Sequence, residues 1–279
     1  MSGDMFKSMP KLAIIAAMER EVRPLVRSWK IRTIEFGGRR YRLFEKGDVV
    51  LICGGIGSEA ARRATETVIR EVSPTRVISV GFAGALDASL QVGDVFTPRA
   101  VINASDGVRT DVESGQGVLV SSATVAGKEQ KSRFAKAYGA GAVDMEAAAV
   151  AEGAQARGVE FSAMKVISDS LDFDMPALDR FIAGDGMFQS FRFACHVALR
   201  PWLWGTAIAF ARNSSKASHA LCRALVSYLE PVRTYKNISG EPAMLKSSVD
   251  EFDSTNREEF ASAHTTAGLQ AHTEGTQKQ

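Results

Sequence analysis

Histidine is scarce in this sequence and is absent from its first 195 residues. The four histidines are His196, His219, His264 and His272. A Ser-His-Asp triad or a His-ligated metal site within residues 1–195 is therefore excluded, unless His196 or His219 folds back onto that region.

Cysteine is also rare, with only three residues at Cys53, Cys195 and Cys222. Their wide spacing forms neither a metal-binding pair nor a disulfide framework, so we expect a protein of the reducing cytoplasm. The first residues carry no long apolar run after their charges, and we expect no signal peptide.

A strong excess of charge of one sign is lacking, since the net charge is only +2. Binding to nucleic acid through a strongly basic surface is therefore not expected. Hydrophobic residues make up 45% of the 279 residues and charged residues 24%, which is typical of a chain that buries a well-packed core.

Short apolar runs alternate with segments of helical spacing. The pattern predicts helices over residues 19–29, 58–72 and 128–138, and a polar connection over 106–116. Strands are predicted at residues 11–17, 41–45, 49–53, 76–80, 92–97, 100–103, 117–121 and 161–169. This alternation predicts an α/β fold, a three-layer α/β/α sandwich with a mixed, largely parallel central sheet.

The composition changes after residue 186. Residues 187–211 are apolar, aromatic and basic, and Arg192, Arg200 and Pro201 interrupt them. These interruptions argue against a membrane-spanning helix.

The end of the chain contains one further amphipathic segment and then turns polar. A helix is predicted over residues 214–229, and few large apolar residues follow it. We therefore expect one domain over residues 1–230, with an apolar helical extension at 187–230, and a disordered polar tail over 231–279.

The most informative segment begins at Val143 and ends at Asp169. Glu146 opens an alanine-rich helix, and Asp169 ends the apolar strand that follows. Paired carboxylates at strand ends commonly carry out acid–base chemistry on a polar ligand. Each also has a local alternative, because Glu146 fits the first turn of any helix and Asp169 could cap a helix before Leu171.

Three other motifs are ambiguous when taken singly. The pattern Gly55-x-Gly57-x-x-Ala60 fits a loose dinucleotide fingerprint, but no acidic residue follows at the expected distance, and a packing turn explains it better. Residues 81–84 form a predicted glycine turn that either approaches a ligand or only reverses the chain. Glu21 is equally suited to a helix N-terminus.

The joint placement of these residues favours a ligand site. Glu21, residues 81–84, Glu146 and Asp169 all fall just beyond predicted strand ends, where ligands bind in open α/β sheets.

At this point the sequence resembles the purine nucleoside phosphorylase superfamily, specifically its 5′-methylthioadenosine/S-adenosylhomocysteine nucleosidase branch. The motifs that carry the resemblance occur in family order between residues 11 and 175. They are residues 14–22, 54–57, 80–86 with 92–94, and 143–151 with 165–169.

The resemblance implies a role for each of several residues. Asp169 would protonate the purine N7, and Glu21 would orient and deprotonate the attacking water. Glu146 would hold the ribose hydroxyls, with Met145 packed on the sugar and Val125 beside the purine. The same resemblance implies five further substrate-binding residues, Gly81, Phe82, Ala83, Gly84 and Ser168.

The resemblance also implies the chemistry. The N-glycosidic bond of a 5′-substituted adenosine would be hydrolysed through an oxocarbenium-like sugar, and adenine would leave. No cofactor and no metal are expected. The expected partners are a small-molecule adenine nucleoside and a second copy of the chain in a homodimer.

Water is the expected nucleophile, with phosphate as the alternative. Phosphorylases of this group carry an arginine where this chain has Ser79 and Val80, and a carboxylate at Glu21 would repel phosphate. Arg20 and Arg23 flank Glu21, and they leave phosphorolysis open.

The sequence departs from the pattern of the methylthioadenosine nucleosidases in two places, and both point to one subgroup of the superfamily. Phe82 replaces a small hydroxyl residue, and the connection between Asn103 and Gly117 is short. With residues 124–131 and 200–204, they make the chain similar to the hopanoid-associated phosphorylase-like group, which is linked to adenine removal from adenosylhopane.

A lipid-tailed nucleoside would require an open 5′ side and a surface that faces a membrane. Aromatic and basic residues within 187–211 could form such a peripheral membrane contact, although a buried helix or a subunit contact would have the same pattern. They are Phe188, Phe191, Phe193, Trp202 and Trp204 beside Arg192 and Arg200. The third hypothesis, permitted by Phe82, is a non-catalytic module that binds a nucleoside or lipid.

Overall fold

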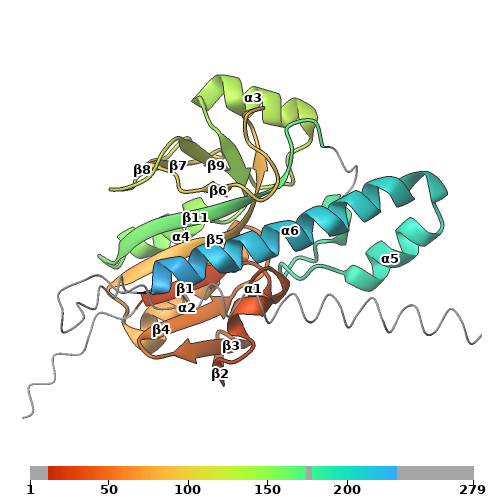
Figure 1. Ribbon diagram of the computed structural model, residues 1–279. Coiled ribbons are helices and arrows are strands. Elements are labelled where there is room, and N and C mark those ends of the chain that lie inside the picture. The colour runs from red at the N-terminus through yellow and green to blue at the C-terminus, as the bar shows by residue number, and fades with distance from the viewer. Residues whose placement is uncertain (1–11, 174–177, 231–279) are drawn as a thin grey trace, which may run out of the picture. The chain divides into compact units, whose positions relative to one another are not determined.

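The computed structural model describes residues 12–173 and 178–230 (Figure 1). Contacts between residues divide the chain into two units, residues 1–222 and 223–279, and only the end of the last helix belongs to the described part of the second. The predicted tail, residues 231–279, lies outside the described residues, so the predicted domain boundary stays a prediction.

A single mixed sheet organises the first unit. Among the described residues its strands follow the order β2 (Lys30–Phe36), β3 (Arg39–Lys46), β4 (Val49–Cys53), β1 (Leu12–Ala16), β5 (Arg76–Ala85), β10 (Ala142–Asp144), β9 (Val118–Ser121), β7 (Ala100–Asn103) and β8 (Arg109–Asp111). Two more strands complete the sheet: β11 (Glu160–Asp169) pairs with β5, and β6 (Val95–Phe96) pairs with β11.

Most inner strands are parallel, and the outer strands are antiparallel. β1 runs parallel to β4 and β5, and β11 runs parallel to β5 along nearly its whole length. The hairpins β2–β3, β3–β4 and β7–β8 are antiparallel, as is the short pairing of β10 with the end of β5. The carboxyl ends of β1 and β11 therefore lie at the same edge, where a ligand site is expected.

Helices cover both faces of the sheet. On β9, Leu119 packs in one cluster with Ala147 of α4, whereas Val118 and Val120 pack in another with Phe134 of α3. Successive side chains of a strand point to opposite faces, so α3 and α4 lie on opposite sides. The predicted three-layer fold is confirmed, with α1 (Glu19–Val26), α2 (Ser58–Val72), α3 (Lys128–Tyr138) and α4 (Ala147–Gln155) as its helices.

The predicted glycine turn at residues 81–84 is wrong. β5 runs through all four residues, and β11 pairs beside them. A Cβ atom on Gly81 would lie 3.0 Å from Oε2 of Glu21, and one on Gly84 would lie 2.8 Å from Oδ2 of Asp169. Glycine is therefore needed here because carboxylates from neighbouring elements occupy the space of a side chain, not because the chain reverses.

The sequence pattern missed the short inner strand β10 and two outer strands, β2 and β8. β2 forms a hairpin with β3 through Gly37 and Gly38, whose φ angles of 57° and 73° suit a two-residue turn. β8 lies within residues 106–116, which were predicted as a polar connection. β2 and β8 are outer strands with exposed positions, so their apolar alternation is weak.

The segment after β11 is helical. It contains η1 (Leu178–Phe181), α5 (Ser190–Ala198), η2 (Pro201–Leu203) and α6 (Trp204–Leu229). The last helix therefore begins ten residues before the predicted start at residue 214. Within the described part of the chain, no helix is long and apolar enough to cross a membrane.

Candidate functional site

A pocket of about 290 Å³ lies at the carboxyl ends of β1, β10 and β11. This volume is close to the lower end of the range for small-molecule sites, about 300–1,000 Å³. The structure brings to it every predicted site residue except Gly81, which lies behind Glu21. Its lining includes Glu21, Phe82, Ala83, Gly84, Val125, Met145, Glu146, Ser168 and Asp169.

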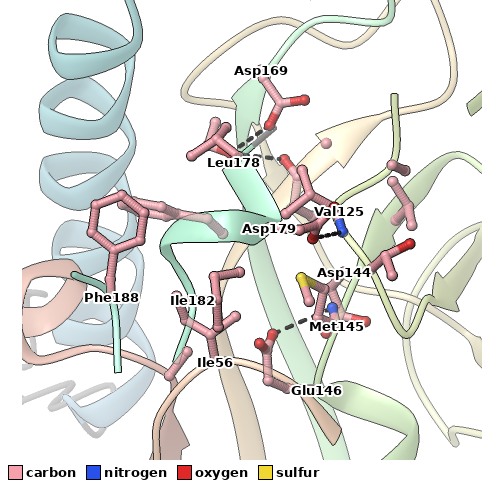
Figure 2. Close-up of a pocket in the computed structure, with 18 of the residues that line it drawn as sticks. Ile56, Val125, Asp144, Met145, Glu146, Asp169, Leu178, Asp179, Ile182 and Phe188 are labelled. Carbon is pink, nitrogen blue, oxygen red and sulfur yellow. Dashed lines mark hydrogen bonds between the residues drawn. The ribbon is translucent and has the colours of Figure 1, made fainter. Parts of the chain in front are cut away.

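Two carboxylates lie at opposite ends of the pocket. Figure 2 shows Glu146 at one end and Asp169 at the other, with Met145 and Leu178 between them. Asp169 is the last residue of β11, and no helix within residues 170–173 follows it as a cap would require. Asp169 therefore faces the pocket from a strand end.

Glu21 projects from α1 and is only 2% exposed. The backbone N–H of Met18 donates to its Oε2 at 3.4 Å. α6 holds the same turn of α1, because the Ser218 hydroxyl donates to the Glu21 carbonyl at 2.9 Å and the Cys222 thiol approaches it at 3.6 Å. The position of Glu21 thus depends on a helix about two hundred residues further along the chain.

Burial controls the protonation of Glu21. Loss of solvent and the nearby Glu146 carboxylate raise the pKa of Glu21 to about 7, against the opposing effect of the cations Lys165 and Arg20. A carboxylate with a pKa near neutrality suits a general base, because it accepts a proton well and is still ionised at the working pH.

Glu146 occupies the N-cap position of α4. Its Oε1 accepts the backbone N–H of Gly57 at 2.9 Å, and its Oε2 accepts that of Met145 at 3.3 Å. Burial raises the pKa of Glu146 to about 7, although the Lys165 ammonium and both N–H groups favour the charged form. The Glu146 carboxylate is one of the groups that raise the pKa of Glu21, so the two acids interact.

An ion pair that the sequence did not predict lies beneath these two acids. Asp144 and Lys165 are 2.8 Å apart, and both side chains are fully buried. Asp144 also accepts the Ser121 hydroxyl at 2.5 Å and the backbone N–H of Ala147 at 2.8 Å.

Lys165 stays charged in this environment. Burial by itself lowers the pKa of Lys165, but the carboxylates of Asp144 and Glu146 outweigh burial and raise it. A lysine inside an apolar strand was the available signal for this pair, since lysine is rarely buried without a partner.

A second unpredicted ion pair involves Asp169. The buried ammonium of Lys131, on α3, contacts Oδ2 of Asp169 and donates to the Ser170 carbonyl at 2.7 Å. The Ser168 hydroxyl donates to the other oxygen, Oδ1, at 2.8 Å. Nothing in the pattern of α3 distinguished Lys131 from its exposed neighbour Lys128.

The opposite wall of the pocket is apolar and aromatic. Phe173 and Phe210 stack with their ring centroids 6.2 Å apart, and Arg20 lies 4.9 Å from the ring centroid of Phe188. The backbone N–H of Val125 donates to Asp179 at 2.9 Å, which ties the segment before α3 to η1.

The titratable groups give no metal site in the part of the chain that the structure describes. No three His, Cys, Asp or Glu side chains are grouped there to hold an ion. The charged groups of the pocket are instead paired with lysines or with backbone N–H donors.

Comparison with known proteins identifies the family. Residues 11–122 and 114–184 match the family described as the phosphorylase superfamily. The chain belongs to the phosphorylase superfamily. The matched range includes β1, the strands around the pocket and all the acidic residues that line it.

The proteins that this chain resembles in sequence include nucleosidases. A 5′-methylthioadenosine/S-adenosylhomocysteine nucleosidase of Staphylococcus carnosus is 36% identical over 111 residues, 38% of this chain and 48% of that protein. The homologous enzyme of Staphylococcus aureus strain JH9 is 28% identical over 196 residues, 57% of this chain and 86% of the relative. The chain spans under half the length of the relatives it matches at 34–36% identity.

Solved structures share the fold. An S-adenosylhomocysteine nucleosidase of Streptococcus pyogenes in complex with 5-methylthiotubericidin has a TM-score of 0.60 and 19% identity, and covers 81% of this chain and 99% of its own. The futalosine hydrolase of Helicobacter pylori has a TM-score of 0.59 and 18% identity, with coverage of 77% and 95%. These similarities support the phosphorylase-like fold.

Proposed function

We propose that this protein hydrolyses the N-glycosidic bond of a 5′-substituted adenosine and releases adenine. The observation that carries the proposal is the arrangement of three carboxylates around one pocket, with Glu21 and Glu146 buried together and Asp169 at the other end. The nucleosidase names of several relatives support the same reaction.

In the proposed reaction, water attacks C1′ of the ribose as the bond from C1′ to N9 of adenine breaks. The bonding electrons leave with the base, and Asp169 delivers a proton to N7 to neutralise it. Glu21 accepts a proton from the water. A positioned acid or base contributes about 10²–10⁴-fold to the rate of such a step.

Asp169 is oriented for this role at both oxygens. Ser168 donates to Oδ1 and Lys131 contacts Oδ2, so the carboxyl group has little freedom to rotate. The ion pair holds its proton on the Lys131 ammonium, which passes it to Asp169 as Asp169 delivers a proton to N7 of the base. We therefore include Lys131 in the proposed machinery as a positioning residue that acts through Asp169.

Glu146 would bind the sugar. Two backbone N–H groups hold its carboxylate, and its remaining lone pairs can accept hydrogen bonds from the ribose hydroxyls. Its negative charge, near that of Glu21, would also stabilise the positive charge that develops on the sugar in the transition state. Met145, next to it in the pocket, would pack on the ribose.

The charges that line the pocket favour water over phosphate. Five acidic residues line it, Glu21, Asp144, Glu146, Asp169 and Asp179, against the cations Arg20 and Lys131. Lys131 is already paired with Asp169. A phosphate dianion would need several unpaired cations, so phosphorolysis is the second candidate and depends on Arg20.

The apolar wall of the pocket indicates which kind of 5′ substituent the pocket would accept. Phe173, Ile182, Phe188 and Phe210 all line the pocket, and they would accept an apolar group better than the charged tail of S-adenosylhomocysteine. We therefore extend the proposal to a hydrophobic 5′ substituent of the adenosylhopane type, with methylthioadenosine as the smaller alternative.

The test measures adenine release from methylthioadenosine, S-adenosylhomocysteine and an adenosyl lipid, each with and without phosphate. We expect release without phosphate, and fastest release from the lipid substrate. Release that requires phosphate would select phosphorolysis, and binding of adenosine analogues without turnover of any substrate would select a non-catalytic module.

The matched variants are Asp169→Asn and Asp172→Asn. Asp172→Asn is the control, because the Asp172 side chain is 77% exposed and pairs with Lys128 outside the pocket. Asp169→Asn should lose adenine release with the fold intact, and Asp172→Asn should retain it. Full activity in Asp169→Asn would refute the role proposed for this acid.

A further inference from the structure

Exposed apolar side chains gather on α5, η2 and the first turns of α6. The exposed fraction is 81% for Phe191, 77% for Leu199 and 74% for Trp202. Ile208 and Trp204 follow at 60% and 51%. Large exposed apolar side chains concentrated in one segment often mark an interaction site. These five residues are called the apolar tip below.

The apolar tip follows from the helix geometry. Phe191 and Leu199 are eight residues apart on or next to α5 and share its exposed face, and α5 has no buried residue. The opposite face packs inward, where Phe193 lies 5.4 Å and His196 lies 5.1 Å from Phe181, between ring centroids. The side chains of α5 that pack inward are therefore on one face, and the other face is exposed to solvent.

The charged residues of the segment that carries the apolar tip all have one sign. No aspartate or glutamate occurs between residues 186 and 222, while Arg192, Arg200, Arg212 and Lys216 lie in that range. On α6, Trp204, Ile208 and Arg212 follow at four-residue spacing, so the exposed face changes from apolar to basic along the helix. Figure 1 shows α5 and α6 joined through the short η2 turn.

We infer that the apolar tip and its arginines dock onto an anionic phospholipid bilayer. Aromatic and aliphatic side chains enter the interface, where tryptophan is favoured, and the arginines attract the lipid phosphates. Each basic residue near an anionic surface strengthens binding several-fold. The docking surface needs no nucleoside, so this inference goes beyond the proposed function and is tested apart from it.

The charge distribution favours a lipid surface over a second copy of the chain. In a two-fold symmetric dimer the same patch would face itself, and arginines would meet arginines without an acidic partner. An anionic bilayer supplies the missing negative charge. The helices that carry the tip also contribute Phe210 and neighbouring Phe188 to the pocket, so docking would bring the pocket wall close to the lipid.

The experiment is sedimentation of the full chain with vesicles. Neutral vesicles contain phosphatidylcholine alone, and anionic vesicles contain one quarter phosphatidylglycerol. We expect binding to anionic vesicles, weak binding to neutral ones, and loss of binding at high salt because ions screen the attraction.

Two sets of variants separate the apolar contribution to vesicle binding from the electrostatic contribution. Phe191→Ser with Leu199→Ser and Trp202→Ser should weaken binding roughly hundredfold, because three large side chains no longer enter the interface. The control is Ile31→Ser with Val108→Ser, two apolar residues that are each 49% exposed outside the tip. Arg192→Gln and Arg212→Gln should each weaken binding about fivefold and reduce its salt dependence.

Three outcomes would overturn the inference. They are absence of vesicle binding, equal binding to neutral and anionic vesicles, and binding of the triple serine variant as strong as that of the unchanged protein. A dimer that the triple variant dissociates, without vesicle binding by the unchanged protein, would instead identify the tip as a subunit interface. Adenine release from a water-soluble substrate should be equal in all variants.

Discussion

Lys131 and Asp169 form an ion pair at the end of the pocket opposite Glu146, and Lys131 is almost completely buried. Gly84 makes room for both partners, since a Cβ atom there would lie 2.8 Å from Oδ2 of Asp169 and 3.2 Å from Cε of Lys131. The pair joins α3 to the end of β11, so the proposed acid is held by an element far from it in sequence.

The first prediction concerns this pair. Lys131→Met should lower kcat for adenine release about 10²-fold with little change in KM, because Asp169 loses its orientation and its proton source. It should also change the pH profile, which a purely structural defect would not. Lys131→Arg should recover part of the activity, since it restores a cation. Lys128→Met is the control, because Lys128 pairs with Asp172 outside the pocket.

The second prediction is a pH profile. The pKa values of Glu21 and Glu146 are both raised to about 7, chiefly by burial, and the proposed reaction needs both groups ionised. The kcat/KM should therefore fall as the pH drops below about 7, with a slope between one and two on logarithmic axes. A profile that is flat from pH 5 to pH 8 would contradict the role of Glu21.

The third prediction concerns stability. Folding raises the pKa of Glu21 from the ordinary value of 4.5 to about 7. Between these two values the folded state binds one proton more than the unfolded state, so stability falls as the pH rises from about 4.5 to about 7 and is level above it. Glu21→Gln should raise the free energy of unfolding by roughly 1–3 kcal/mol at pH 8 and by almost nothing near pH 4.5.

Urea denaturation at the two pH values measures this difference, and adenine release measures the accompanying loss of activity. A loss of stability in Glu21→Gln at pH 8 would contradict this prediction. It would mean that hydrogen bonds and nearby cations stabilise the ionised Glu21 carboxylate more than burial destabilises it. A more stable but inactive variant is the expected result, because a destabilising group is retained for function.

The fourth prediction concerns the buried ion pair between Asp144, which lines the pocket, and Lys165. Lys165→Met leaves Asp144 charged and without its cation, which should cost about 3–5 kcal/mol of stability. The control is Lys30→Met, which changes an exposed lysine at the start of β2. Thermal or urea unfolding measures both variants, and a cost below 1 kcal/mol for Lys165→Met would show that Asp144 does not depend on it.

Local patterns were sufficient for α2, for α3 and for most inner strands. The predicted helix over residues 58–72 agrees with α2, and the apolar run before Asp169 agrees with β11. These elements have strong periodicity that depends only on their own residues. The outer strands β2 and β8 were missed because their partly exposed positions lack such a pattern.

The amino-acid sequence thus determined the fold class and three of the five acidic residues that line the pocket, Glu21, Glu146 and Asp169. Only the tertiary structure decided that Gly81 and Gly84 lie within a strand and that Lys131 and Lys165 pair with Asp169 and Asp144. These features depend on contacts between residues distant in sequence. A glycine has the same local signature whether it turns the chain or makes room for a carboxylate, and a lysine gives no local sign of its partner.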